Sequence, residues 1–204
     1  FRSMPAGQGN TWRQKTGHEI IVSSYLKVTT TDYAPYEMFD NDSATFWGAS
    51  WTNSDNFYDS TNKGKFTQSS YNSSGAYIGG GTNALGINNF FTTAFSGGTG
   101  SANGEWIDLL YPYFVRLTSI SIMCRTGLVT TAPKTVIMLG SNNNGTSWVF
   151  IQTLAFSTYT AGTFQTLPIT TTEKYSRIRI LITETRLDGV NISGLQLGIE
   201  IWDY

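Results

Sequence analysis

The chain has 204 residues and a net charge of -1, with 13 Lys and Arg against 14 Asp and Glu. This length suits one domain with a sizeable core, and the balanced charge provides no positive field for phosphate backbones, so we expect no nucleic-acid partner. Charged residues are only 13% and aromatic residues 14% of a chain rich in Gly, Ser, Thr and Asn. That composition is typical of short strands joined by polar turns, and it predicts an all-β protein.

Residues 1–17 show no periodicity and are interpreted as an N-terminal arm or linker, and residues 18–204 as one β-sandwich domain. A helical turn or two is expected at 35–39, where a proline suits the first helical position. Runs of β-branched and aromatic residues predict eight strands, at 19–28, 105–110, 115–124, 134–139, 148–154, 163–169, 175–183 and 190–202.

Alternation assigns faces to these strands. Ile120, Ile122 and Cys124 share one face, whereas Arg177 and Arg179 lie on the face opposite their neighbouring isoleucines. Cys124 is the only cysteine and is expected to be a small buried apolar side chain without a disulfide.

A turn at residues 40–47 concentrates oxygen donors. It contains the carboxylates of Asp40 and Asp42 and the hydroxyl of Thr45, and Ca²⁺ binds six to eight oxygens of these kinds. The same residues also suit an Asx turn with solvated acids. The glycine and the distal glutamate of an EF-hand loop are absent, which excludes that motif.

Four blocks in order resemble the discoidin domains, a group that includes coagulation factor C domains and family 32 carbohydrate-binding modules. The blocks are YEMFDND with the following Thr45 and Trp47, GEWIDL at 104–109, PKTVIMLGSNNNGTSW at 133–148, and YSRIRI at 175–180 with VNISGLQL at 190–197. The resemblance implies an eight-stranded antiparallel jelly-roll sandwich whose loops bind ligand at one end. It also implies a structural Ca²⁺ held by Asp40, Asp42, Thr45 and a carbonyl near Phe39. Many relatives have a glutamate where this chain has Gly194.

A long insertion, residues 48–103, is where we expect the recognition loops. Aromatic rings pack on the apolar faces of sugars, while amides, carboxylates and guanidinium groups hydrogen-bond their hydroxyls. The candidate ligand-binding residues are Trp51, Asn53, Asp55, Tyr58, Tyr71, Asn72 and Tyr77, with Arg125 and Arg186 from other loops. Alternatively, these aromatic side chains pack the insertion onto the sandwich.

Catalysis is not expected. His18 is the only histidine, and no nucleophile turn surrounds it. Acids for glycoside hydrolysis could come from Asp40, Asp42, Glu105, Asp108 or Glu184, but the required separation across a cleft cannot be read from sequence.

The sequence therefore predicts a non-catalytic, lectin-like adhesion domain that binds a glycan or glycoprotein. The form of its blocks and its lack of cysteine pairs are similar to discoidin-like domains of large DNA viruses and microbes. We therefore expect an extracellular or virion-surface location and contacts with other surface proteins. The insertion carries few lysines, and we do not expect membrane binding. The alternative is a structural capsid-associated or fibre module that contacts other proteins and has no sugar site.

Overall fold

The computed structural model describes residues 11–13, 19–22, 26–28, 31–33, 35–49, 92–127, 129–185 and 190–202. These residues are mostly β-strand, and their helices are short 3₁₀ turns, η1 (Pro35–Phe39) and η4 (Val129–Thr131). None of the described helices is long and apolar enough to cross a membrane. The predicted all-β fold is confirmed, and so is the helical turn at 35–39.

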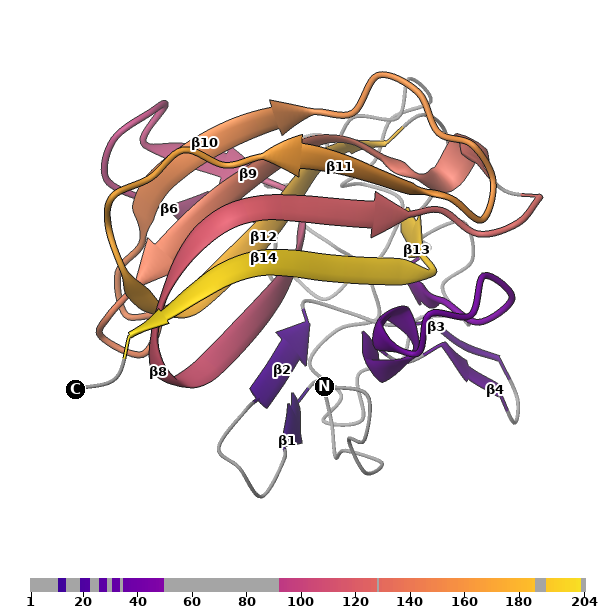
Figure 1. Ribbon diagram of the computed structural model, residues 1–204, viewed down its shortest axis with the longest axis horizontal. Coiled ribbons are helices and arrows are strands. Elements are labelled where there is room, and N and C mark those ends of the chain that lie inside the picture. Colours follow the sequence, from indigo (N-terminus) through magenta and orange to yellow (C-terminus); the bar gives the residue numbers. More distant parts are fainter. Residues whose placement is uncertain are drawn as a thin grey trace.

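The main sheet contains eight antiparallel strands (Figure 1). They are β1 (Thr11–Arg13), β2 (Glu19–Val22), β8 (Glu105–Met123), β9 (Pro133–Ser141), β10 (Val149–Ala155), β11 (Phe164–Pro168), β12 (Tyr175–Thr185) and β14 (Gly194–Trp202). Three two-stranded ladders complete the described strands: β3 (Leu26–Val28) with β4 (Thr31–Tyr33), β5 (Trp47–Ala49) with β13 (Val190–Ile192), and β6 (Thr92–Ala94) with β7 (Ser101–Asn103).

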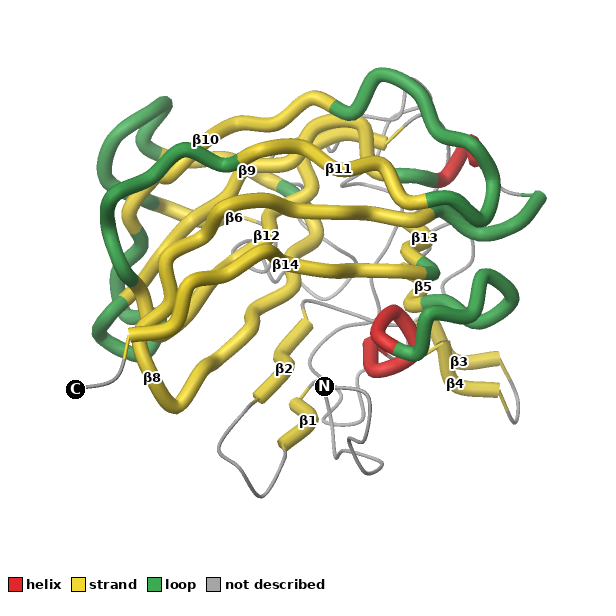
Figure 2. The backbone as a smooth tube through the Cα atoms, in the orientation of Figure 1, coloured by secondary structure: helices red, strands yellow, loops and turns green. Residues whose placement is uncertain are grey.

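Strand β8 belongs to both layers of the sandwich. Its first part, up to Leu110, pairs with β2 and β12, and β12 continues the layer to β9 and β10. Its second part, from Phe114 onward, pairs with β14 on one edge and β11 on the other. Figure 2 shows the tube of β8 bending back on itself between these two parts. The eight-stranded sheet is thus one sheet folded over at β8.

The bend lies at Tyr111–Tyr113, between two strands that the sequence predicted as separate. Pro112 is exposed there, and proline is tolerated in a sheet where no ladder bond is required from its nitrogen. The neighbouring Tyr111 ring is buried, and burial raises the pKa of its phenol, with a smaller contribution from Tyr113. The proline therefore marks a corner within one strand.

The core between the layers has the predicted alternation. Ile120, Ile122 and Cys124 are all fully buried, as expected for one inward face. In the other layer, Ile178 and Ile180 are fully buried on the inner face of β12. The Cys124 thiol is fully buried, as predicted for a small apolar side chain.

A second apolar cluster lies on the outer face of the β8–β12–β9 layer. The hairpin β6–β7 supplies Phe95, whose ring stacks on Phe150 with centroids 6.1 Å apart. Trp148 and Leu181 pack in the same cluster. The last part of the predicted insertion is therefore a hairpin packed onto the sandwich.

Two arginines and one aspartate form the polar part of this cluster. Asp108 is fully buried, and its carboxylate accepts hydrogen bonds from Arg177 Nη2 at 2.7 Å and Arg179 Nε at 2.6 Å. Arg179 is also sandwiched between aromatic rings, 4.0 Å from the Trp106 centroid and 4.3 Å from that of Trp148. The arginines lie on the face predicted from alternation, and their partner comes from β8.

The division into an arm and a domain stays a prediction. Strand β1, inside the predicted arm, pairs with β2 at the edge of the first layer.

Candidate functional site

The Asp40–Thr45 turn, directly after η1, is built by its own side chains. Asp40 Oδ1 accepts a hydrogen bond from the amide of Asp42 at 2.8 Å, and Asp42 Oδ1 accepts one from the amide of Ala44 at 2.9 Å. These are two successive Asx turns. Asn41 between them has φ 67°, a left-handed conformation that asparagine tolerates better than most residues. These hydrogen bonds confirm the Asx turn that the sequence predicted.

Ser43 docks this turn against the end of the sandwich. Its carbonyl accepts a hydrogen bond from the amide of Thr126 at 3.3 Å, and its hydroxyl lies 3.0 Å from that of Thr126. The Ser193 hydroxyl, between β13 and β14, lies 3.5 Å from the same carbonyl. Contacts among residues so far apart in sequence cannot be read from a local pattern, and the sequence did not predict that Ser43 contacts Thr126 and Ser193.

Three oxygens of the turn lie close together and are hydrogen-bonded to one another. Thr45 Oγ1 lies 2.6 Å from Asp40 Oδ2 and 3.2 Å from the carbonyl of Asp42. Both aspartates are exposed and can exchange these contacts for a metal. The donor set fits Ca²⁺ in part, because six to eight oxygens are needed and the others would come from backbone carbonyls and water. Phe39 ends η1 directly before Asp40.

A third acidic ligand is not part of this arrangement. Among the described residues, no three His, Cys, Asp or Glu side chains gather as a metal-binding group. Gly194, the position at which the resemblance implied a glutamate in related domains, pairs with Met123, and a Cβ there would lie 2.6 Å from the Phe164 ring. A longer side chain at this position would have to displace that ring, so any cation site must manage without its carboxylate.

Arg125 lies at the same end of the sandwich as the turn. Its guanidinium carbon is 4.2 Å from the centroid of the Phe46 ring, and its neighbour Thr126 contacts Ser43. The side chain is partly exposed, so its remaining donors can reach a ligand. The structure thus brings this predicted binding residue next to the predicted metal turn.

The other predicted ligand residues lie outside the described residues: Trp51, Asn53, Asp55, Tyr58, Tyr71, Asn72, Tyr77 and Arg186. The ladder beside them is described. Ala49, at the end of β5, pairs with Val190, at the start of β13. The chain therefore enters residues 50–91 and leaves residues 186–189 at adjacent positions.

The acids considered for catalysis have other partners in the structure. Asp108 is enclosed by two arginines, and Glu184 Oε2 accepts a hydrogen bond from the Thr135 hydroxyl at 2.6 Å. Glu105 is fully buried at the start of β8. Asp40 and Asp42 hold their own turn.

No protein-family model matches the sequence, and no curated protein matches it either. Among solved structures, the F5/8 type C domain of a Bacteroides fragilis protein superposes with a TM-score of 0.50 at 13% identity, over 96% of this chain and 99% of that one. The chain has a discoidin-like fold.

Two carbohydrate-binding structures share this discoidin-like fold. The CBM32-5 module from Clostridium perfringens, solved with GalNAc-β-1,3-galactose, has a TM-score of 0.53 and 9% identity over 88% of this chain and 94% of that one. The CBM32-1 and CBM32-2 domains of Clostridium perfringens ZmpB superpose with a TM-score of 0.52 at 13% identity, over 87% of this chain. The matched part is 33% of that longer chain. Both neighbours are family 32 carbohydrate-binding modules.

Proposed function

We propose that this protein is a non-catalytic, lectin-like carbohydrate-binding domain that binds glycans through loops at one end of its sandwich. The main support is the fold, which it shares over nearly its whole length with a module solved in complex with GalNAc-β-1,3-galactose. The proposed binding surface consists of residues 50–91 of the predicted insertion, together with Arg125 and Arg186, because residues 92–103 form the hairpin packed onto the outer face of the sandwich. A glycan array probed with the isolated chain is the direct test, and binding to no glycan would contradict the proposal.

The position of Arg125 supports this end of the sandwich. Its guanidinium is already oriented by the Phe46 ring, so little side-chain entropy remains to be lost when a sugar binds. Phe46 precedes β5, from which the chain runs into residues 50–91. We further propose adhesion at an extracellular or virion surface as the setting, with a glycoprotein as the partner.

Replacing Arg125 tests this surface. Arg125→Ala should weaken binding of GalNAc-β-1,3-galactose about tenfold, because a hydrogen bond from a charged donor is worth about 1.5–3 kcal/mol. Isothermal titration calorimetry measures the change. Lys134→Ala, which removes an exposed cation from β9, is the control and should bind as the parent does. If the parent protein, Arg125→Ala and Lys134→Ala all bind the sugar with equal affinity, Arg125 is not part of the site.

We also propose that the Asp40–Thr45 turn binds a structural Ca²⁺ through Asp40, Asp42, Thr45 and backbone carbonyls near Phe39. A cation bound only by the folded protein should raise the free energy of unfolding by about 2.7 kcal/mol at a calcium concentration 100 times Kd. Thermal unfolding with calcium and with chelator measures this effect. Asp42→Ala should abolish it, whereas Ser157→Ala, at an exposed loop position, should not. A midpoint that is the same in calcium and chelator would contradict the proposal.

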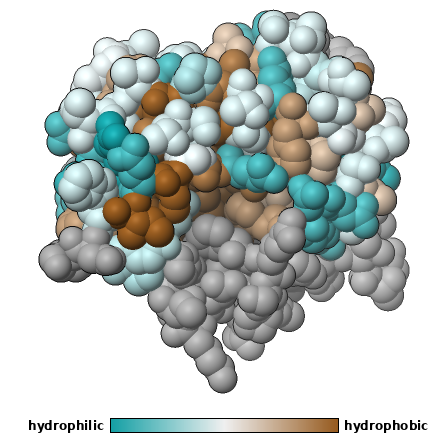
Figure 3. Space-filling model, in the orientation of Figure 1, coloured by the Kyte–Doolittle hydropathy of each residue, from teal (hydrophilic) through white to brown (hydrophobic). Residues whose placement is uncertain are grey.

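The alternative, a structural module that contacts other proteins, has one observation in its favour. Ile201 and Trp202 at the end of β14 are 53% and 45% exposed. Figure 3 shows apolar surface beside the C-terminal end of the chain. Analytical ultracentrifugation separates the two functions: a monomer that binds glycan supports the lectin, and an assembly without glycan binding supports the structural module.

A further inference from the structure

The turn that joins β9 to β10 contains three consecutive asparagines followed by a glycine, Asn142–Gly145. It lies at the end of the sandwich away from β13, and so away from the proposed glycan surface (Figure 1). The three asparagines are exposed, and Asn144 and Gly145 have φ values of 57° and 79°. Because glycine has no side chain, its backbone nitrogen is open to close approach by the asparagine side chain before it.

Asn142 and Asn143 use their side-chain amides to build the turn. Asn142 Nδ2 donates to the carbonyl of Lys174 at 2.9 Å, and its Oδ1 accepts a hydrogen bond from the amide of Ser176 at 2.9 Å. Asn143 Nδ2 donates to the hydroxyl of Ser147 at 2.7 Å, and its Oδ1 accepts a hydrogen bond from the Ser147 amide at 3.0 Å. Both side-chain amides are therefore held at the nitrogen and at the oxygen.

The side-chain amide of Asn144 is held only at its oxygen. Asn144 Oδ1 accepts a hydrogen bond from Arg177 Nη1 at 3.2 Å, and the same nitrogen donates to the Asn144 backbone carbonyl at 2.8 Å. Asn144 Nδ2 has no hydrogen-bond partner among the residues that the structure describes. The amide oxygen thus faces a cation, whereas the amide nitrogen is free.

Arg177 also packs against the glycine of the turn. A Cβ on Gly145 would lie 3.0 Å from the guanidinium carbon, and the Gly145 amide donates to Ser141 Oγ at 3.0 Å. Arg177 is fixed from its other side by Asp108, whose carboxylate lies 2.7 Å from Nη2. A positive charge is therefore held beside the Asn144 side chain and the residue that follows it.

These contacts suit an intramolecular attack on the Asn144 side chain. The Gly145 nitrogen, once it has lost its proton to hydroxide, bonds to Asn144 Cγ; the bond from Cγ to Nδ2 breaks, and the side-chain nitrogen leaves as ammonia. Water then opens the cyclic succinimide at one of its two carbonyls, which leaves aspartate or isoaspartate. Negative charge develops on Asn144 Oδ1 during the attack, and the Arg177 guanidinium stabilises charge at that position.

We propose that Asn144 is a site of spontaneous deamidation that Arg177 promotes. The proposal is independent of the carbohydrate function. The product carries a carboxylate next to a cluster in which Asp108 faces two guanidinium groups, those of Arg177 and Arg179. In the aspartate form, a neutral contact of Arg177 becomes a charge-assisted one. The reaction also adds a negative charge to a chain whose net charge is -1.

A second Asn-Gly pair, Asn103–Gly104, provides a matched control within the same chain. Asn103 pairs with Thr92 in the β6–β7 ladder, and Gly104 packs so closely on Ile182 that a Cβ would overlap its carbonyl oxygen. Ring closure requires rotation of the backbone between asparagine and glycine, which the hydrogen bonds of a ladder resist. We therefore expect Asn103 to be protected in the folded protein and to react only after unfolding.

The test is incubation of the whole chain at mildly alkaline pH, folded and in guanidinium chloride, followed by peptide mapping with mass spectrometry. Asn144 should convert about tenfold faster in the folded protein than in the denaturant, because Arg177 is placed beside it only in the fold. Asn103 should convert more slowly in the folded protein than in the denaturant. An Asn144→Asp variant supplies the reference peptide for the aspartate product.

Arg177→Gln tests the role of the guanidinium. This variant should convert Asn144 at the rate of the unfolded chain, and continued protection of Asn103 shows that the variant is folded. If Asn103 loses its protection in the variant, the comparison of the folded and unfolded parent decides alone.

Three results would overturn the proposal. The first is an Asn144 rate in the folded parent no higher than in the denaturant, which would mean that the turn does not promote the reaction. The second is equal conversion of Asn144 and Asn103 in the folded parent. The third is an unchanged Asn144 rate in Arg177→Gln with Asn103 still protected. None of these results bears on glycan binding, which the array measures separately.

Discussion

Asp108→Asn should lower the free energy of unfolding by about 3–5 kcal/mol, because removing one partner of a buried ion pair leaves the other charge uncompensated. Asp108 is 0% exposed, and its partners Arg177 and Arg179 are only 11% and 12% exposed. Asparagine keeps the size of the side chain, so the loss measures charge and not volume. Urea unfolding, followed by the fluorescence of the cluster, gives the change directly.

A second arginine–carboxylate ion pair, which is more exposed to solvent, provides the control. Arg116 and Glu200 are 34% and 44% exposed, and exposed pairs contribute about 0–1 kcal/mol. Glu200→Gln should therefore change the free energy of unfolding little. A similar loss in both variants would mean that the burial of Asp108 does not determine its contribution.

Gly104→Ala is expected to cost about 3 kcal/mol of stability, at the upper end of the range for overpacking. Gly104 directly precedes β8, and a Cβ at this position would overlap the carbonyl oxygen of Ile182 and lie 2.8 Å from its carbonyl carbon. Because Ile182 is held in the β12 ladder with both β8 and β9, the clash can be relieved only by moving a central strand. Urea unfolding of the variant measures the cost.

Ser101→Ala, at an exposed position of the β6–β7 hairpin that precedes Gly104, is the matched control and should change stability by less than about 0.5 kcal/mol. If Gly104→Ala proves as mild as this control, the close approach to Ile182 is not a constraint. If the prediction is right, the glycine that begins the GEWIDL block is required by packing and not by function.

Alternation in the sequence was sufficient for the layers of the fold but not for their connection. The inward face of Ile120, Ile122 and Cys124 follows from period two alone, and it is confirmed. The strands predicted at 105–110 and 115–124 are one strand, β8, with a corner at Pro112. Whether such a residue ends a strand or sits at its corner depends on partners far along the chain, which a local pattern does not contain.

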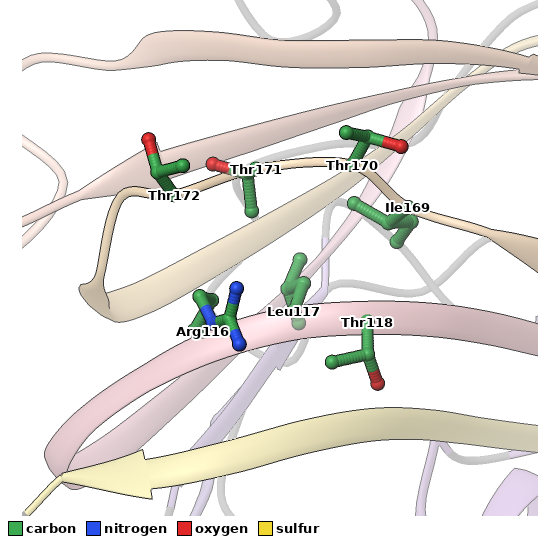
Figure 4. A pocket seen from close by; sticks show the side chains of 7 residues that line it. All are labelled: Arg116, Leu117, Thr118, Ile169, Thr170, Thr171 and Thr172. Atoms are coloured by element: carbon green, nitrogen blue, oxygen red, sulfur yellow. The ribbon is translucent and has the colours of Figure 1, made fainter.

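The candidate sites show the same limit. Asp40, Asp42 and Thr45 are close in sequence, and their convergence could be predicted from the turn. The pairing of Asp108 with Arg179 depends on the register of β8 against β12. Residues 116–118 and 169–172, far apart in sequence, line one groove in the structure (Figure 4). Sites assembled across strands therefore require the structure.

Because β8 belongs to both layers of the sandwich, its pairing affects how the protein folds. One edge of β8 is completed by β2 along the first half of the strand and by β14 along the second half. Neither layer can be finished from neighbouring segments alone, and folds dominated by such distant pairings form slowly. During synthesis, the second half of β8 would wait for residues 194–202 with one edge unpaired, so the sandwich is completed only after these residues have left the ribosome.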